Sequence, residues 1–113
     1  MKKGEIWIID IPGLGGHSQQ GTRPALIIAA PKLPVVIAIP CTSNLQALKF
    51  PYTIRIEPSN RNGLTVPSIA LVFQMLAIDR KFIQKKIGTL EKQLLTGIDT
   101  QIQKLLLSEK NLS

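Results

Sequence analysis

Two continuous apolar runs near the middle of the chain, residues 25–30 and 35–39, are separated by only the turn at residues 31–34, Pro-Lys-Leu-Pro. Short runs that are apolar throughout predict strands buried on both faces. So short a connection leaves no room for a crossover helix, so the two strands must pair antiparallel. This hairpin favours a compact antiparallel sheet and argues against a doubly wound parallel sheet.

The segments around this hairpin predict further strands. Residues 4–11 are rich in isoleucine and include a tryptophan, a composition typical of a strand. Residues 50–57 alternate apolar and polar side chains, which predicts a half-exposed antiparallel strand. Residues 68–78 predict one or two more strands, and the Asn62-Gly63 pair before them is a strong turn signal. We therefore expect about five or six short strands.

The spacing of the apolar residues changes near the end of the chain. Residues 79–86 predict a short helical turn with a basic cluster, and residues 88–108 predict an amphipathic helix with Thr89 as its N-cap. The apolar positions recur at a spacing of three or four: Leu90, Leu94, Ile98, Ile102 and Leu105. The predicted fold is mainly β with a C-terminal helix (α+β), a strongly bent sheet or small barrel, in one domain over residues 1–113.

The totals exclude several classes of protein. No apolar run approaches the roughly 18 residues of a membrane span. The short apolar segment after the basic start contains Asp10 and has no small-residue cleavage site, unlike a signal peptide. The single cysteine, Cys41, permits no internal disulfide and fits a reducing, cytoplasmic compartment. One cysteine and one histidine do not make a structural zinc site, so we expect no metal and no cofactor.

The chain is strongly basic, with a formal net charge of +7. A basic domain of this size favours a polyanionic partner such as RNA, DNA or an acidic protein, although excess lysine can also serve solubility alone. Aromatic residues make up only 4% of the chain, too few for a sheet that stacks several bases. A nucleic-acid site would therefore depend on charge and hydrogen bonding.

The segment at residues 16–24, Gly-His-Ser-Gln-Gln-Gly-Thr-Arg-Pro, concentrates the residues suited to phosphate chemistry. It contains the only histidine, His17, which can transfer a proton near neutral pH. Arg23 has a permanent charge and a planar set of donors suited to phosphate oxygens. Pro24 favours an extended conformation at Arg23 and so holds it at the entrance to a strand. The simpler alternatives are a structural Arg23 that binds loop carbonyls and a solvated His17.

Blocks of sequence along nearly the whole chain resemble one family. They are Lys3-Gly4-Glu5-Ile6-Trp7, the stretch from Gly16 to Ile28, Leu33-Pro34-Val35-Val36 leading to Pro40-Cys41-Thr42-Ser43, Gly63-Leu64 with Ser68, Gln74 with Ile78-Asp79-Arg80, and Lys86-Ile87-Gly88. In this order and at this spacing they resemble the PemK/MazF ribonuclease toxins of bacterial toxin–antitoxin pairs. The resemblance implies a small SH3-like β-barrel of the PemK/MazF/CcdB type that forms a homodimer. It also implies metal-independent, sequence-selective cleavage of single-stranded RNA, restrained by an acidic antitoxin.

The resemblance assigns Arg23 and Thr42 to the cleavage site and gives His17 a part in the chemistry. The 2′-hydroxyl of RNA would attack the neighbouring phosphate and leave a 2′,3′-cyclic phosphate and a 5′-hydroxyl. Arg23 would stabilise the charge of the transition state, and His17 would transfer a proton. The residues expected to bind RNA are Gln19, Gln20, Ser43, Asn44, Arg80 and Lys81.

Two alternatives stay open at this point. Phe73 stands where many family members carry an acidic residue, which favours a catalytically silent member that binds RNA or antitoxin. A gyrase-poisoning toxin of the same fold is the other alternative, and it would require exposed residues on the C-terminal helix. The Gly-Thr-Arg-Pro block together with Thr42 favours the ribonuclease.

Overall fold

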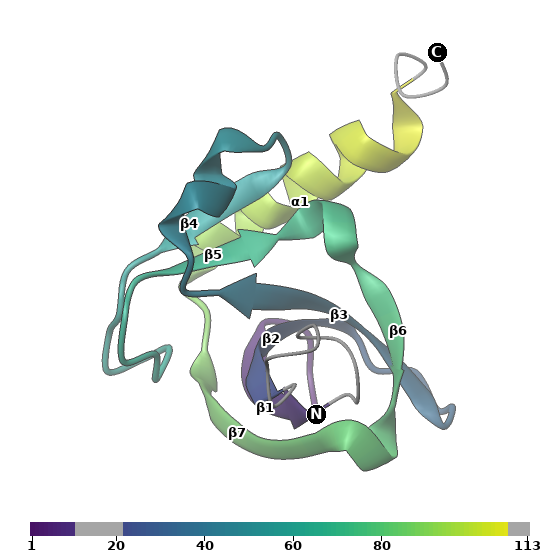
Figure 1. The fold of residues 1–113 in the computed structure, drawn as a ribbon. Helices are drawn as coiled ribbons and strands as arrows, with labels where there is room; N and C mark the ends of the chain where they lie inside the picture. The colour runs from purple at the N-terminus through teal and green to yellow at the C-terminus, as the bar shows by residue number, and fades with distance from the viewer. Residues whose placement is uncertain (11–21, 109–113) are drawn as a thin grey trace.

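A computed structural model describes residues 1–10 and 22–108 (Figure 1). Its strands are β1 Glu5–Asp10, β2 Thr22–Ala29, β3 Val35–Thr42, β4 Thr53–Ile56, β5 Ser68–Leu71, β6 Leu76–Asp79 and β7 Ile83–Thr89. One helix, α1 Lys92–Leu107, follows them, and short 3-10 turns span Leu45–Lys49 (η1), Val72–Gln74 (η2) and Arg80–Phe82 (η3). The predicted class, mainly β with a C-terminal helix, is confirmed.

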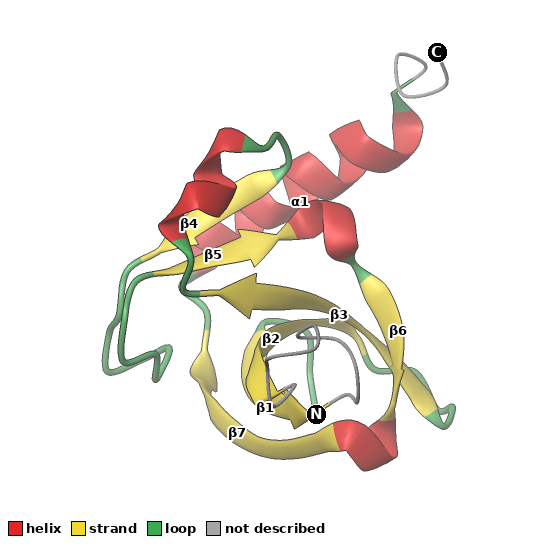
Figure 2. Ribbon diagram, viewed as in Figure 1, coloured by secondary structure: helices red, strands yellow, loops and turns green. Residues whose placement is uncertain are grey.

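The strands form one strongly bent antiparallel sheet. Its order is β4-β5-β3-β2-β1-β7, and β6 pairs with the first half of β3. Figure 2 shows β3, β6 and β7 curling around β1 and β2. Within the described residues β4 and β7 end the path and do not pair with each other, so the sheet is open and the word barrel applies loosely.

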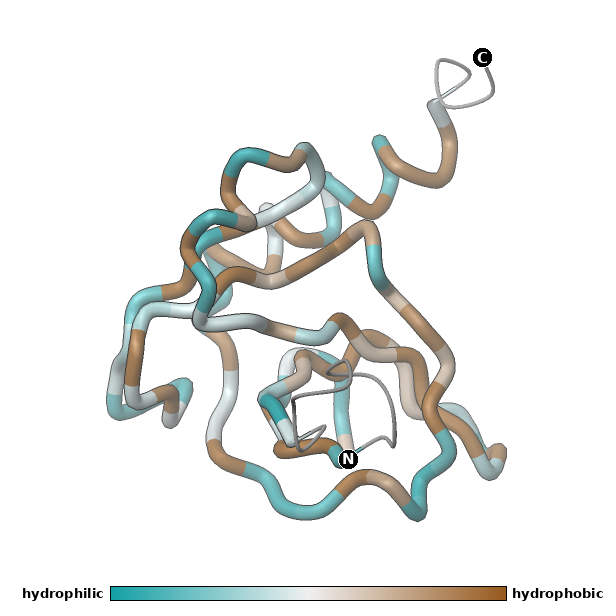
Figure 3. The backbone as a smooth tube through the Cα atoms, viewed as in Figure 1, coloured by the Kyte–Doolittle hydropathy of each residue, from teal (hydrophilic) through white to brown (hydrophobic). Residues whose placement is uncertain are grey.

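The hairpin predicted around residues 31–34 is confirmed, with Leu26 opposite Ile39. Its strands bury both faces, because neighbouring side chains enter two different apolar clusters. Leu26 and Ile39 join Ile98 of α1 in one cluster, which we call the helix-side core. Ala25 and Ile27 join the other cluster, the inner core, with side chains of β1, β3 and β6. Figure 3 shows that the most hydrophobic stretches follow these strands.

The predicted start of the helix is wrong. Thr89 is the last residue of β7, where it pairs with Glu5 and donates its N–H to the carbonyl of Arg61. The helix begins at Lys92, with Glu91 at its N-cap. Residues 83–89 form a strand because their pairing with β1 outweighs their weak helical tendency. Without this pairing, the edge of β1 would leave backbone groups unsatisfied. The expected number of strands therefore rises to seven.

Residues 45–57 also differ from the prediction. The strand expected over residues 50–57 is shorter and begins at Thr53, since Tyr52 adopts a positive φ of 60°. The turn η1 before it was not predicted, because its residues show no helical or alternating period. Asn44 caps η1 by accepting the N–H of Gln46.

Asn62 is the centre of a buried polar network. Its Oδ1 accepts the N–H groups of Ser59 and Leu64, both at 3.0 Å. Its Nδ2 donates to the carbonyl of Glu57 at 2.9 Å and to Oε1 of Glu91 at 3.2 Å. Asn62 is fully buried, yet both its donors and its acceptor are satisfied, which is the condition for a buried amide to stabilise a fold.

Next to this network, the turn at residues 59–63 packs directly on the backbone of β7. A Cβ atom on Gly88 would lie 2.3 Å from the carbonyl carbon of Asn62. A Cβ atom on Gly63, which has a φ of +74°, would lie 1.9 Å from the carbonyl oxygen of Ile87. Only glycine fits at these two positions, and their contact fixes where the chain enters the segment 63–68.

Glu5 anchors the start of the sheet. Its carboxylate accepts hydrogen bonds from Trp7 Nε1 and the Lys2 N–H, both at 3.0 Å, and pairs with Lys86 Nζ at 3.0 Å. Partial burial works to raise the pKa of Glu5, but these hydrogen bonds and the Lys86 charge outweigh it and lower the pKa from 4.5 to about 2. Folding therefore stabilises the charged form of this carboxyl group.

A pair of glycine variants tests the contact with β7. We expect Gly88→Ala to lower the free energy of unfolding by about 1–3 kcal/mol, because the new methyl group collides with backbone. Gly97→Ala is the matched control within α1, where the new Cβ would lie 3.4 Å from Ile54 Cδ1. It should raise the free energy of unfolding by up to about 1 kcal/mol, since alanine favours a helix. Urea unfolding measures both, and a Gly88→Ala protein as stable as the parent would contradict the contact.

Acid should weaken the fold through Glu5. Because the folded pKa of Glu5 lies below its ordinary value, its stabilisation is complete above about pH 4.5 and is lost as the pH falls toward 2. The Glu5→Gln variant should lose less stability than the parent across this range, as measured by thermal unfolding at each pH. Glu57→Gln, which changes an exposed carboxylate, controls for net charge. Equal acid sensitivity in Glu5→Gln and the parent would refute this role.

Candidate functional site

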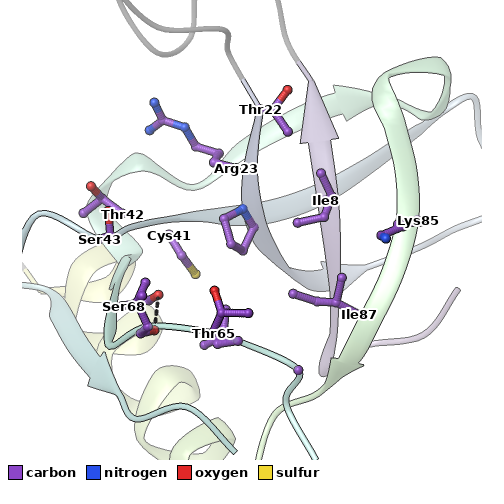
Figure 4. A pocket seen from close by; sticks show the side chains of 14 residues that line it. Ile8, Thr22, Arg23, Cys41, Thr42, Ser43, Thr65, Ser68, Lys85 and Ile87 are labelled. Atoms are coloured by element: carbon purple, nitrogen blue, oxygen red, sulfur yellow. Dashed lines mark hydrogen bonds between the residues drawn. The ribbon is translucent and has the colours of Figure 1, made fainter.

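A pocket of about 370 Å³ opens where β2 and β3 face β7 across β1 (Figure 4). Five stretches of the chain build it. Its lining residues are Ile8 of β1, Thr22, Arg23 and Pro24 of β2, Cys41, Thr42 and Ser43 at the end of β3, Gly63, Leu64, Thr65, Val66 and Ser68 before and in β5, and Lys85 and Ile87 of β7. The pocket therefore combines cationic and hydroxyl side chains with apolar walls.

The pairing of β2 with β3 brings Arg23 and Thr42 together. Ala25 lies opposite Pro40, and continuing this antiparallel register by two residues places Arg23 opposite Thr42. Both side chains then lie on the same face of the sheet, because side chains two residues apart share a face. In Figure 4 the Arg23 guanidinium extends to the side of the pocket where Thr42 and Ser43 lie.

Arg23 has an unused buried donor. Its Nε atom is buried and has no hydrogen-bond partner among residues 1–10 and 22–108, and no carboxylate in those ranges forms an ion pair with its guanidinium. A buried donor of a charged group costs stability when it is left unpaired. This arrangement suits an arginine that receives an anion from outside the chain.

Thr42 and Ser43 supply hydroxyl groups beside this cation. Thr42 Oγ1 accepts the N–H of Asn44 at 3.1 Å, which leaves the hydroxyl hydrogen available for another acceptor. Ser43 is exposed at the rim of the pocket. Asn44 is occupied by its capping bond to Gln46 and is not one of the lining residues.

Cys41 lies on the wall of the pocket but is only 1% exposed. Burial raises the pKa of its thiol to about 12, although the nearby Arg23 charge works in the opposite direction. The thiol is therefore protonated at any physiological pH, and its Sγ lies 3.9 Å from the carbonyl oxygen of Ile39.

Two other predicted site residues, Arg80 and Lys81, have contacts away from the pocket. Arg80 donates from Nε and a terminal nitrogen to the carbonyls of Leu33 and Pro31, at 2.8 and 2.6 Å, and so holds the turn at residues 31–34. Lys81 lies with its Nζ 5.2 Å from the centre of the Phe82 ring. Neither residue lines the pocket. His17, Gln19 and Gln20 lie outside the described residues.

Sequence reasoning did not find the far side of the pocket. Lys85 belonged to the predicted basic cluster, but its place opposite Ile8 follows from the pairing of β7 with β1. Thr65 and Ser68 follow the Asn62-Gly63 turn, and this segment was marked by its strong turn signal and by the family block Gly63-Leu64 with Ser68, but neither feature assigned it to the pocket. Ser68 is buried and donates to the carbonyl of Val66 at 3.1 Å.

The described part of the chain holds neither a cluster of metal-binding side chains nor a helix that could span a membrane. Over residues 1–10 and 22–108, no group of three or more His, Cys, Asp or Glu side chains is arranged to hold a metal ion. In the same residues no helix has the length and apolar character required to cross a membrane.

Known proteins resemble this chain along most of its length. The curated endoribonuclease EndoA of Bacillus subtilis (strain 168) is 27% identical over 107 residues, a match that covers 91% of each chain. The crystal structure of MazF (Form-I) from Deinococcus radiodurans superposes with a TM-score of 0.73 at 21% identity, covering 94% of this chain and 96% of that one. A mycobacterial endoribonuclease in complex with its cognate antitoxin gives a TM-score of 0.73 at 16% identity and covers 94% of both chains.

The structural similarities bear on the fold, and the sequence comparison bears on the family. Residues 2–106 match the model for the PemK-like, MazF-like toxin of type II toxin–antitoxin systems. Since this match spans nearly the whole chain, the protein belongs to the family of PemK-like, MazF-like toxins of type II toxin–antitoxin systems.

Proposed function

We propose that the protein is a metal-independent endoribonuclease toxin that cleaves single-stranded RNA at the pocket between Arg23 and Lys85. The observation that carries the proposal is the Arg23 guanidinium, whose buried Nε has no partner in the part of the chain that the structure describes and which lines the same pocket as Thr42. The relatives EndoA and the mycobacterial protein are named endoribonucleases, which supports the same chemistry here.

In the proposed reaction the RNA supplies its own nucleophile. A base removes the proton of a 2′-hydroxyl, the oxygen attacks the adjacent phosphorus, and the bond from phosphorus to the 5′-oxygen breaks. The leaving 5′-oxygen takes up a proton, so the products are a 2′,3′-cyclic phosphate and a 5′-hydroxyl. No water and no redox step is needed.

Arg23 and Thr42 would stabilise the crowded phosphate in this step. The guanidinium presents two or more N–H donors to phosphate oxygens whose negative charge grows in the transition state. The Thr42 hydroxyl, fixed by the N–H of Asn44, donates to a third oxygen or orients the attacking 2′-hydroxyl. Because these groups are positioned before substrate arrives, little reorganisation is required during the reaction.

The other predicted site residues are proposed either to transfer a proton or to bind the RNA. His17 is the proposed proton-transfer group, because it is the one histidine of the chain. Gln19, Gln20, Ser43 and Asn44 are proposed to read bases and thereby to select the cleaved sequence. Arg80 and Lys81 are proposed to attract the RNA backbone outside the pocket.

The proposed partners are an acidic antitoxin and a second copy of the chain. The net charge of +7 favours an acidic antitoxin, and the mycobacterial relative was solved with its cognate antitoxin. A homodimer would cover the exposed apolar side chains around η1 and η2, where the rings of Phe50 and Phe73 lie 5.9 Å apart.

The first test of the reaction is cleavage of a mixed-sequence single-stranded RNA in excess EDTA. We expect the parent to cut and Arg23→Ala to lose about 10²–10³-fold in rate, as for loss of one preorganised donor. Arg55→Ala is the matched control, since Arg55 is exposed and lies outside the pocket, where it pairs with Glu57. Thermal unfolding checks that all three proteins fold.

Product analysis completes this test. Cyclic-phosphate and 5′-hydroxyl ends identify attack by the 2′-hydroxyl, whereas 5′-phosphate ends would overturn the mechanism. An Arg23→Ala protein that cuts as fast as Arg55→Ala would remove Arg23 from the chemistry. A parent protein that binds the RNA but does not cut it would favour the catalytically silent alternative.

Cys41 should take no part in the reaction. Its thiol is buried and protonated, so we expect almost no labelling by iodoacetamide in the folded protein at pH 8 and complete labelling in urea. Cys41→Ala should keep the parent cleavage rate within about threefold, because the thiol is a small packing group in the wall of the pocket. Rapid labelling of the folded protein would contradict the buried, inert thiol.

A further inference from the structure

Lys85 is the second cation of the pocket. It lies on β7 opposite Ile8, its side chain is exposed, and no described carboxylate pairs with it. The adjacent Lys86 is bound to Glu5 at 3.0 Å. The two neighbouring lysines therefore differ in availability, and only Lys85 lines the pocket.

Lys85 and Arg23 enter the pocket from two strands, β7 and β2, that are separated by β1. Pro24 pairs with Ile8, and Ile8 pairs with Lys85. Two strand spacings, roughly 10 Å in total, therefore separate the backbone of Pro24 from that of Lys85. In Figure 4 Lys85 enters the pocket from the side opposite to Arg23 and Thr42. Ile8 lies between the two cations in Figure 4, and Ile87 and Thr65 also line the pocket.

We infer that Lys85 binds the RNA phosphate next to the one that is cleaved, so that the pocket holds one nucleoside between two phosphate contacts. This inference rests on the proposed ribonuclease function and specifies how its substrate lies. RNA has one charge per nucleotide with a partly apolar nucleoside between consecutive charges. The pocket has the same sequence of features, namely a cation, an apolar strip with a hydroxyl, and a second cation.

The chemistry of lysine fits this secondary contact. Lysine is a compact charge on a flexible stem and binds phosphate without demanding one orientation, whereas arginine fixes phosphate geometry with its planar donors. The reacting phosphate would thus be oriented by Arg23, and its neighbour would be held by charge alone. Lys85 is therefore a positioning residue that sets where the strand lies and does not touch the reacting atoms.

The test compares RNA binding by the parent, Lys85→Ala and Lys32→Ala. Lys32 is an exposed lysine outside the pocket, so its variant changes net charge equally. The probe is a short RNA with 2′-O-methyl groups throughout, which cannot be cleaved by its own 2′-oxygen. In a plot of log affinity against log salt, we expect the slope of Lys85→Ala to be smaller by about 0.7 than that of the parent. Lys32→Ala should match the parent.

A second probe locates the contact on the strand. Replacing single phosphates of the RNA by neutral methylphosphonates should weaken binding by the parent at the phosphate adjacent to the cleavage position. At about 50 mM salt the same replacement should weaken RNA binding by Lys85→Ala by less than half of the factor measured for the parent, because the lysine contact is already absent. Lys32→Ala should show the full loss. A loss of equal size in Lys85→Ala and the parent would overturn the inference.

The outcomes separate this inference from the proposed function. If the parent cleaves RNA but Lys85→Ala keeps the parent salt slope, the second phosphate contact is wrong and the ribonuclease stands. If the parent neither binds nor cleaves RNA, both proposals fall. If Lys85→Ala keeps its RNA affinity but loses affinity for poly-glutamate, Lys85 serves an acidic protein partner and the inference is overturned.

Discussion

The close contact between the turn at residues 59–63 and β7 is the constraint on which the pocket depends. Gly63 and Gly88 allow two backbones to meet where no side chain fits, and the buried amide of Asn62 holds the turn in place. The same contact fixes two walls at once, because the segment 63–68 leaves from the turn and Lys85 and Ile87 lie on the strand beneath it. A backbone contact without side chains thus determines the shape of a site made of side chains.

The opposite wall is built differently. There the register of β2 and β3 brings Arg23 and Thr42 together, supported by apolar side chains on both faces of the sheet. This rigid support allows Arg23 to keep a buried donor without a partner in the described chain, a local cost that the surrounding core tolerates. Glu5 neutralises Lys86 nearby, while Arg23 and Lys85 have no acidic partner among the described residues. The pocket therefore contains two positive charges that no described carboxylate neutralises.

The wall of the pocket formed by β2 and β3 was predicted well from the sequence. The apolar runs around residues 31–34 determine their own pairing, and that pairing follows from short-range geometry alone. The prediction failed for β7, because a strand rich in lysine and glutamine owes its conformation to a distant partner, β1. Lys85 and Thr65 could not be assigned to a pocket until this long-range pairing was known. Thr89 was mistaken for a helix cap for the same reason, since its N–H is taken by Arg61.

The tandem lysines of β7 have a consequence for how the strand finds its register. A slip by one residue that moved Lys86 opposite Ile8 would carry Lys85 on toward Ile9, away from Glu5, and would put Ile87 in the place of Lys86. Glu5 would then lose its lysine partner. The same slip would move Gly88 away from Asn62 and bring Thr89, a residue with a side chain, into a space that holds none. Fidelity of the alignment thus rests on a glycine together with one ion pair.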